Sequence, residues 1–284
     1  LLRPDVLISI GGMVVSKKIK EFLRKYPPKA HYYIDEHVGY DTFFVLTHHF
    51  KTDINTFLET VVPELPPVSF DYKGVWLPLY KETLERRTAF LATVPFSDMA
   101  VYKAILERTP TPYHIQISNS APIRYAQLFP AKAGWQVFCN RGTSGIDGST
   151  STAIGASVVQ SIPTLLITGD LSFFYNSNAL WCNYIPKNLK IIVVNNAGGG
   201  IFRILPTDKG TPFFETFQET THSLTAKHLC AMYGFTYLCV QNQEELTKTL
   251  KTFFSQYESP MFLEVFTPRI LNNTILKDYF NVLS

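Results

Sequence analysis

The chain has 284 residues, of which 46% are hydrophobic, 17% charged and 14% aromatic, and this composition excludes a disordered or collagen-like protein. Its 26 basic and 23 acidic side chains leave a formal net charge of +3, and the absence of a dense basic run argues against nucleic-acid binding. No apolar stretch is as long as the about 18 residues that a membrane-spanning helix needs, and no secretory signal is visible. At about 100–200 residues per domain, we expect one large or two modest domains.

The cysteines predict a reducing environment. Cys139, Cys182, Cys230 and Cys239 form no CxxC pair, and four cysteines in a chain of this length do not make a disulfide framework. We therefore expect free thiols and a cytoplasmic location. The chain starts with Leu1 and enters an apolar strand within five residues, from which we expect a fragment that lacks its upstream part.

The pattern of residues 1–62 predicts a small β-α-β unit. Asp5–Gly12 has the apolar character of a buried strand, and Ser16 is a suitable N-cap for a helix that ends before Pro27-Pro28. A second strand is expected at His31–Asp35 and a short helix at Ile54–Val61. Prolines then gather over residues 63–80, which predicts a connector, and a helix over Leu79–Ala92 makes 63–90 a linker with a crossing helix.

Residues 91–284 predict a parallel sheet with helices on both faces, because continuous apolar strands alternate with helical segments. The expected strands are His114–Ile117, Gln136–Cys139, Thr164–Thr168, Lys190–Val194, Phe235–Val240 and Met261–Phe266. The expected helices are Ser97–Glu107, Ala121–Leu128, Ser149–Gln160, Phe173–Tyr184 and Gln243–Tyr257. The predicted fold is therefore an α/β domain preceded by the tail of a second α/β domain.

Polar residues follow two of these strands. Asp170 comes after the strand at 164–168, and Asn195-Asn196 with the run Ala197–Gly200 comes after the strand at 190–194. Asp170 and Asn196 are 26 positions apart, about the reach of a parallel crossover, so neighbouring strands would bring both side chains to the sheet edge where ligands bind. A carboxylate and an amide oxygen suit Mg²⁺, and glycines let backbone N–H groups approach phosphate. The pattern predicts a diphosphate held through Mg²⁺.

Simpler interpretations of the same residues remain open. Asp170 alone also suits a helix N-cap, and Asn195-Asn196 alone suits a turn. His48-His49 has no third ligand at a suitable spacing, which predicts a surface loop rather than a metal site. We expect His222 and His228 to take no part in the chemistry.

The spacing of Gly169-Asp170 and Asn196 resembles the cofactor motif of thiamine diphosphate (ThDP) enzymes, although Leu171 stands where a third glycine is usual. The strings NRGTSGIDG (140–148) and NNAGGGIF (195–202) are similar to those of the SEPHCHC synthase family of that superfamily, where SEPHCHC is 2-succinyl-5-enolpyruvyl-6-hydroxy-3-cyclohexene-1-carboxylate, an intermediate of menaquinone biosynthesis. Asn119-Ser120 with Arg124, and Gly12 with Ser16-Lys17, fit the same family. The resemblance spans nearly the whole chain.

This resemblance implies three α/β domains per complete chain. Residues 1–62 would be the C-terminal part of the central domain and 91–284 the ThDP diphosphate-binding domain, with the N-terminal pyrimidine-binding domain absent. That absent domain would supply the glutamate that activates the cofactor from a neighbouring subunit. No catalytic residue is therefore assigned here, the fragment alone is expected to be inactive, and a homodimer or homotetramer is expected for the complete enzyme.

The resemblance also implies a transferase reaction: decarboxylation of 2-oxoglutarate on ThDP, then addition of the succinyl carbanion equivalent to isochorismate. The implied Mg²⁺ ligands are Asp170, Asn196 and the Gly198 carbonyl. The implied cofactor-binding residues are Ser144, Gly145, Ile146, Asp170, Gly198, Gly199 and Ile201. The implied substrate-binding residues are Lys17, Ser120, Arg124, Arg141, Phe202 and Leu205. Arginines suit this role because a guanidinium binds a carboxylate through two hydrogen bonds.

Lys18 occupies a position where the family often has arginine, so a contact between Lys18 and a substrate carboxylate is left open. Arg203 is expected to be solvated.

Two alternatives to membership of the SEPHCHC synthase family are weaker. Another ThDP decarboxylase, such as an acetolactate synthase, would usually carry Gly-Asp-Gly where this chain has Leu171. A non-catalytic nucleotide-binding domain would usually carry a Gly-x-Gly-x-x-Gly turn between a strand and a helix, which this sequence lacks.

Overall fold

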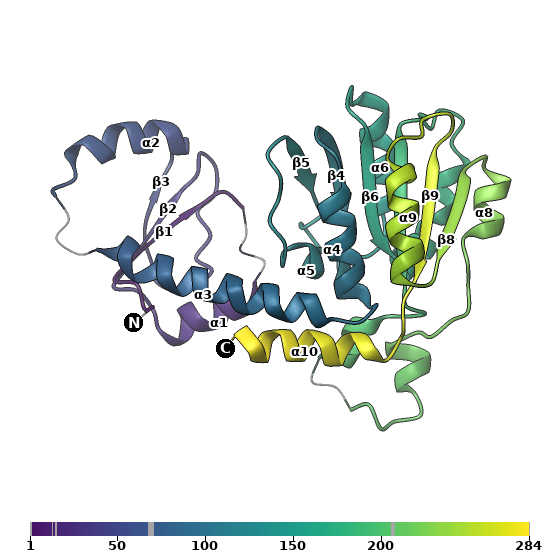
Figure 1. The fold of residues 1–284 in the computed structure, drawn as a ribbon. Helices are drawn as coiled ribbons and strands as arrows, with labels where there is room; N and C mark the ends of the chain where they lie inside the picture. The colour runs from purple at the N-terminus through teal and green to yellow at the C-terminus, as the bar shows by residue number, and fades with distance from the viewer. Residues whose placement is uncertain (1, 13, 15, 68–70, 206–207, 284) are drawn as a thin grey trace. The chain divides into compact units, whose positions relative to one another are not determined.

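The computed structural model describes residues 2–12, 14, 16–67, 71–205 and 208–283 and is drawn in Figure 1. It divides into two compact units, Leu1–Val75 and Trp76–Ser284, and each unit holds a parallel sheet of its own. The predicted α/β class is therefore confirmed. Residues 68–70 of the expected connector lie outside the described residues.

The first unit is built on three parallel strands in the order β1-β2-β3. Its elements are β1 (Val6–Ile10), α1 (Lys17–Lys25), β2 (Ala30–Ile34), β3 (Leu46–Phe50), α2 (Ile54–Val61) and a 3-10 turn, η1 (Val62–Glu64). The predicted N-cap of α1 is confirmed, because the Ser16 hydroxyl accepts a hydrogen bond from the Ile19 N–H. Asp53 caps α2 in the same way, so both helices start where a side-chain oxygen satisfies free N–H groups.

Two predictions for the first unit are wrong. Val6, Ile8 and Ile10 of β1 are 53%, 55% and 54% exposed, because alternate residues of a strand share one face of the sheet and no described element covers these three side chains. His48 and His49 lie in β3 instead of a surface loop. Pairing with β2 places them there, and such tertiary pairing overrides a weak local β preference.

The second unit carries a six-stranded parallel sheet in the order β5-β4-β6-β7-β9-β8. Its strands are β4 (Tyr113–Ile117), β5 (Trp135–Phe138), β6 (Thr164–Gly169), β7 (Leu189–Asn195), β8 (Thr236–Val240) and β9 (Met261–Phe266). The helices from the connector onward are α3 (Tyr72–Thr93), α4 (Asp98–Arg108), α5 (Ala121–Ala126), α6 (Ser149–Val159), α7 (Asp170–Tyr175), α8 (Lys227–Met232), α9 (Gln243–Phe253) and α10 (Leu271–Leu283). Shorter turns are η2 (Ser177–Trp181), η3 (Gly200–Arg203) and the π-helical η4 (Phe214–Gln218). All the strands predicted for this unit are present.

Alternate residues of the central strands pack on opposite faces of the larger sheet. In β7, Ile192 and Val194 belong to one buried cluster, whereas Ile191 and Val193 belong to the other. Residues of α4, α5, α9 and α10 complete the first cluster, and residues of α6, α7 and α8 complete the second. Burying each such side chain contributes about 1.5–3 kcal/mol, so the apolar runs that predict a two-sided sheet also stabilise it.

Several helices differ from prediction. The helix expected at 173–184 is broken at Asn176, whose side chain accepts a hydrogen bond from the Ser151 N–H (2.8 Å). α3 begins inside the expected connector, where the Asp71 carboxylate accepts from the Gly74 N–H (2.7 Å), and Pro78 lies within the helix. α8 and α10 were not predicted, although α10 buries an apolar stripe that contains Ile275 and Tyr279.

The helices in the described part of the chain differ from membrane-crossing helices. No single helix there has both the length and the apolar character that a crossing requires. α3 and α4 meet the criterion only when they are counted together, and they are bent by 110° at the break between them.

A buried lysine lies at the start of β7, at the end of the strand opposite to Asn195. Lys190 has no exposed surface, and its ammonium donates a hydrogen bond to the Gln256 carbonyl. The ammonium also lies 4.4 Å from the ring centre of Tyr257 and 5.3 Å from that of Phe253. Burial lowers the pKa of Lys190 to about 8, because the apolar surroundings disfavour the charged form.

The lowered pKa predicts a stability that rises with pH. Between the folded pKa near 8 and an unfolded pKa of about 10.4, the unfolded chain binds more protons, so raising the pH favours folding. From pH 8 to pH 10 we expect this group to add about 2 kcal/mol to the free energy of unfolding. Urea denaturation at both pH values measures the change. Lys190→Met should lack this increment, whereas Lys187→Met, at an exposed position, should retain it; equal slopes for the two variants would refute the assignment.

Candidate functional site

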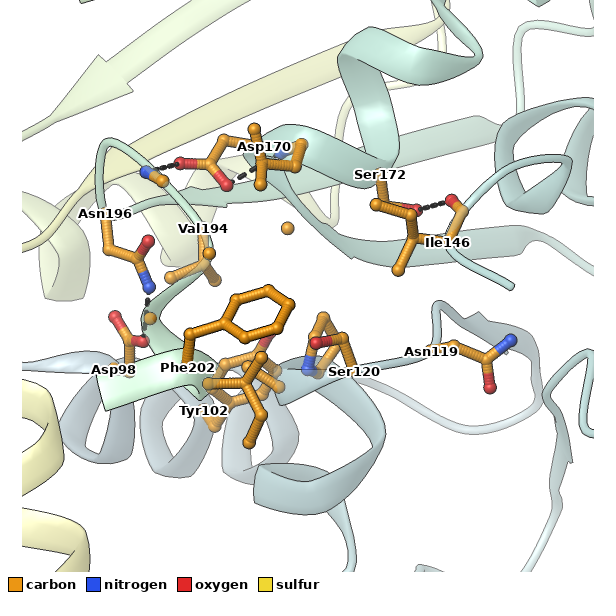
Figure 2. Close-up of a pocket in the computed structure, with 18 residues that line it drawn as sticks. Asp98, Tyr102, Asn119, Ser120, Ile146, Asp170, Ser172, Val194, Asn196 and Phe202 are labelled. Carbon is orange, nitrogen blue, oxygen red and sulfur yellow. Dashed lines mark hydrogen bonds between the residues drawn. The ribbon is translucent and has the colours of Figure 1, made fainter. Parts of the chain in front are cut away.

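A cavity of about 310 Å³ lies at the carboxyl ends of β6 and β7. It is lined by the residues that follow these two strands, by Asp98 and Tyr102 of α4, by residues 119–122 and by Ile146 (Figure 2). β6 and β7 pair in parallel, with Gly169 opposite Val194. The two polar strand ends are therefore neighbours at one edge of the sheet, as the sequence predicts.

Asp170 is held by backbone N–H groups. Its carboxylate accepts from the Leu171 N–H (2.7 Å) with one oxygen and from the Gly198 N–H (2.9 Å) with the other, and the residue is 3% exposed. The first contact satisfies one free N–H at the start of α7, but Gly169 is the N-cap of this helix and Asp170 its first residue, so the N-cap interpretation of Asp170 is wrong. The second contact joins Asp170 to the glycine run after β7, which a capping role alone does not require.

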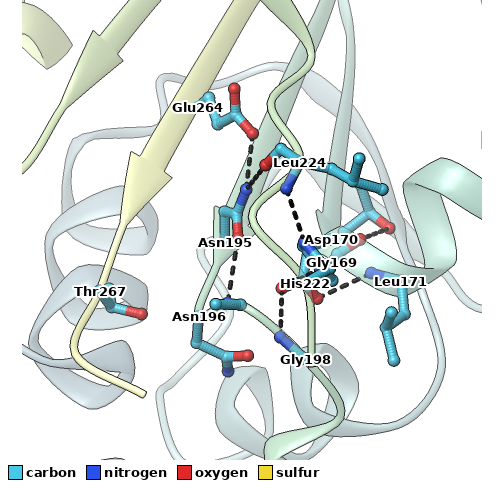
Figure 3. A network of polar contacts seen from close by, with 12 residues as sticks. Gly169, Asp170, Leu171, Asn195, Asn196, Gly198, His222, Leu224, Glu264 and Thr267 are labelled. Atoms are coloured by element: carbon cyan, nitrogen blue, oxygen red, sulfur yellow. Dashed lines mark hydrogen bonds and ion pairs between the residues drawn. The ribbon is translucent and has the colours of Figure 1, made fainter. Parts of the chain in front are cut away.

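His222 lies beside the same carboxylate (Figure 3). Its Nδ1 accepts from the Leu224 N–H (3.1 Å), so the neutral ring carries its proton on Nε2. Nε2 lies 3.2 Å from Oδ2 of Asp170, although it makes no hydrogen bond to this oxygen. His222 thus lies beside a candidate site residue, a neighbourhood that no spacing in the sequence predicts.

Asn196 presents an amide oxygen without a partner. Its Nδ2 donates to Oδ2 of Asp98 (2.9 Å), while its Oδ1 is buried and accepts no hydrogen bond. Figure 2 shows this oxygen pointing toward Asp170. Such an unsatisfied buried oxygen is costly unless a ligand or ion completes it.

The donor set fits a hard cation with oxygen ligands. Within the described residues, no group of three histidine, cysteine or acidic side chains could hold a metal ion. The oxygens present come instead from Asp170, from the Asn196 amide and from the loop backbone, and Mg²⁺ is commonly bound by one or two side chains together with phosphate oxygens and water. The residues present therefore fit a hard cation such as Mg²⁺.

The two asparagines at the end of β7 have different partners. Asn195 donates to the buried carboxylate of Glu264 (2.8 Å) and accepts from the Ala197 N–H (3.0 Å), so it fixes the start of the turn. Asn196 faces the cavity. The sequence analysis names Asn196, and not Asn195, as the candidate ligand, and it is Asn196 that lines the cavity.

The glycine run packs closely against residue 219. Gly198 has a φ of 150°, and a Cβ there would lie 2.9 Å from the Glu219 carbonyl oxygen. The Gly199 N–H donates to this same oxygen (2.6 Å). A side chain at 198 would therefore push the loop away from Asp170.

The expectation that Arg203 is solvated is wrong. Its guanidinium pairs with Glu219, which has no exposed surface, and Arg269 binds the same carboxylate (2.9 Å). The hydrogen bond to Glu219 is the main cause that raises the pKa of Arg203. Because a buried carboxylate requires such partners, this cluster anchors the segment that supports the glycine run.

A second group of polar residues surrounds Asn119. Its amide donates to the carbonyls of Asn140 and Gly145 (both 2.7 Å) and its oxygen accepts from Arg141 (2.6 Å). Arg124 donates to the Ser120 carbonyl (2.6 Å). Partial burial, and then the charge of Arg141, lowers the pKa of Arg124. Two guanidinium groups that influence each other in this way favour an anionic ligand nearby.

The positions of the candidate residues divide into three groups. Those that line the cavity are Ser120, Ile146, Asp170, Asn196, Gly198, Gly199, Ile201 and Phe202. Those in the same unit that do not line it are Arg124, Arg141, Ser144, Gly145 and Leu205. Lys17 belongs to the first unit. Asp98 and Tyr102 line the cavity but were not predicted, because on an amphipathic helix they resemble ordinary capping and core residues.

Comparison with known proteins gives a consistent result. The family model described as "Thiamine pyrophosphate enzyme, C-terminal TPP binding domain" matches residues 120–265. The chain is 49% identical over 282 residues to the 2-succinyl-5-enolpyruvyl-6-hydroxy-3-cyclohexene-1-carboxylate synthase of Flavobacterium psychrophilum, covering 99% of this chain and 51% of that protein. For the proteins of the same name, the identity is 48% over 283 residues in Flavobacterium johnsoniae (100% and 51% covered) and 40% over 293 residues in Porphyromonas gingivalis (100% and 51% covered). The chain thus spans about half the length of the curated relatives it matches.

The tight packing at Gly198 predicts a large cost for Gly198→Ala. The new methyl group would meet a backbone oxygen at 2.9 Å, so we expect a loss of about 1–3 kcal/mol in the free energy of unfolding. Gly142→Ala is a matched control, because nothing lies within 4 Å of a Cβ at that position, and its effect should stay within about 0.5 kcal/mol. Urea denaturation of both variants measures the difference; similar losses would show that the contact is unimportant.

Proposed function

This chain belongs to the thiamine pyrophosphate enzyme family, and on that premise we propose that it binds the diphosphate end of ThDP through Mg²⁺. The observation that carries the proposal is the arrangement at the edge of the larger sheet. There the Asp170 carboxylate and the unpartnered Asn196 oxygen lie at the ends of two paired strands. We propose that both side chains and the Gly198 carbonyl bind the cation.

The remaining cavity residues would hold the rest of the cofactor. ThDP, when bound, supplies the carbanion stabilisation that decarboxylation of a 2-oxo acid needs. We propose that Ile146 supports its bent conformation and that Ser144, Gly145, Gly199 and Ile201 contact it. Phe202 and Ile201 are half-buried beside the cavity, where apolar side chains exclude water from the reacting atoms.

For the complete enzyme we propose the SEPHCHC synthase reaction, in which 2-oxoglutarate is decarboxylated and its remaining carbons are added to isochorismate. The names of the relatives and the NRGTSGIDG string (140–148) support this choice over other ThDP enzymes. We propose that Arg124 and Arg141 bind substrate carboxylates. The other proposed substrate contacts are Lys17, Ser120, Phe202 and Leu205.

The proposed enzyme needs more than this chain. We propose that residues 1–62 are the tail of a central domain and that a pyrimidine-binding domain, with the activating glutamate, lies in the half of the relatives that this chain does not match. The chain alone would then be inactive. A cytoplasmic homodimer or homotetramer, with sites between subunits, is the assembly that we propose.

Cofactor binding is tested with the variant Asp170→Ala. We expect calorimetry to detect ThDP binding that depends on Mg²⁺, and no binding of NAD. Asp170→Ala should weaken ThDP binding more than about 100-fold, beyond the 10–100-fold typical of residues that only support metal ligands. Asp278→Ala, at an exposed position of α10, is the control and should bind normally. Loss of the circular dichroism signal in Asp170→Ala would instead indicate a purely structural aspartate.

Substrate binding is tested in an enzyme in which this chain is joined to the unmatched half of the F. psychrophilum relative. Arg141→Ala should raise the KM for 2-oxoglutarate or isochorismate at least about 10-fold, because a hydrogen bond to a charged group contributes about 1.5–3 kcal/mol. The ThDP concentration at half-saturation should change little. Arg3→Ala, at an exposed position of the first unit, is the control. Unchanged KM values for both substrates would remove Arg141 from the site.

A further inference from the structure

We infer that Asp98 is a positioning residue, which orients the Asn196 amide so that its oxygen, and not its nitrogen, faces the proposed cation. This inference rests on the proposed function and concerns a residue to which neither the sequence motifs nor the family resemblance gives a role. It depends on the direction of one hydrogen bond and on the burial of both partners.

The direction of that hydrogen bond follows from chemistry. An ionised carboxylate only accepts hydrogen bonds, so the group that Asn196 turns toward Asp98 must be its NH₂. The observed contact is Nδ2 of Asn196 to Oδ2 of Asp98, at 2.9 Å. The amide oxygen is then directed away from Asp98, toward Asp170 (Figure 2). Without an acceptor at position 98, the two orientations of the amide would differ little in energy.

Asp98 is itself rigidly held. It is 2% exposed, and its other carboxylate oxygen accepts from the Thr267 hydroxyl (2.6 Å). Its backbone N–H donates to the Asn272 side chain (2.8 Å). Thr267 follows β9 and Asn272 lies in α10, so two segments distant in sequence hold Asp98, the first at its carboxylate and the second at its backbone N–H.

A purely structural role does not explain the arrangement well. Asp98 is 2% exposed, and burying a carboxylate carries a desolvation cost even when the group is paired. A costly group beside an unpartnered oxygen is instead characteristic of a site prepared for a ligand.

The loop backbone reinforces the same orientation. A Cβ at Gly200 would lie 3.2 Å from Nδ2 of Asn196, a tight contact that glycine avoids where the amide nitrogen reaches Asp98. The Gly198 N–H is bound to Asp170, which fixes the backbone between the two proposed ligands. Asp98 therefore acts on a loop that is already held in place.

The test is a double-mutant cycle with Mn²⁺ as a paramagnetic substitute for Mg²⁺. Electron paramagnetic resonance measures free Mn²⁺ in the presence of ThDP for the wild-type chain, Asp98→Ala, Asn196→Ala and the double variant. Asp98→Ala should weaken Mn²⁺ binding about 10–100-fold, the range of outer-shell residues that orient ligands. In the Asn196→Ala background the same change should have less than about a twofold effect, because Asp98 acts only through Asn196.

Two further variants separate orientation from folding. Thr267→Val removes the other partner of Asp98 but leaves the contact with Asn196 intact, so it should affect Mn²⁺ binding less than Asp98→Ala does. Asp98→Asn should restore part of the affinity, since its amide oxygen still accepts from Asn196 while the Thr267 hydroxyl turns to accept from its NH₂. Thermal unfolding without Mn²⁺ shows whether each variant folds.

The outcomes distinguish this inference from the function on which it rests. If the wild-type chain binds no Mn²⁺ with ThDP, the proposed function fails. If the wild-type chain binds and Asn196→Ala does not, but Asp98→Ala binds like the wild type, the positioning role alone is overturned. The positioning role would also be overturned if Asp98→Ala reduced Mn²⁺ affinity by the same factor in the wild-type chain and in Asn196→Ala. Equal losses would mean that Asp98 acts independently of Asn196.

Discussion

The parallel pairing of β6 with β7 is the interaction on which the rest of the candidate site depends. It places Gly169 opposite Val194, so the residues that follow each strand emerge at the same edge of the sheet. Buried apolar side chains on both faces of β7 hold this pairing. The position of the polar edge is thus a consequence of the hydrophobic core, and a shift in strand register would separate Asp170 from Asn196.

Buried carboxylates fix the loops around that edge. Asp98, Glu219 and Glu264 are each 2% exposed or less, and each receives donors from more than one segment of the chain. Glu219 holds its segment against the glycine run, and Glu264 holds Asn195. Because an unpaired buried carboxylate costs several kcal/mol, these contacts restrict each loop to one arrangement and prepare the cavity before a ligand arrives.

The larger sheet and one part of the site were predictable from local patterns. Apolar runs of strand length identify every strand of that sheet, and the 26-residue spacing brings Asp170 and Asn196 together. The errors occur where long-range contacts decide. His48 lies in a strand because β2 is available to pair with it, and Arg203 is half-buried and paired because residue 219 folds back onto it. Neither partner is near in sequence.

The sequence by itself determined the α/β class, the two polar strand ends and the resemblance to ThDP enzymes, because these depend on residue type and on spacing along the chain. Only the tertiary structure decided that His222 and Asp98 lie beside the two candidate ligands. The physical reason is that hydrogen bonds between distant segments have no periodicity in the sequence. They form after the sheet has assembled, and the packed core sets their geometry.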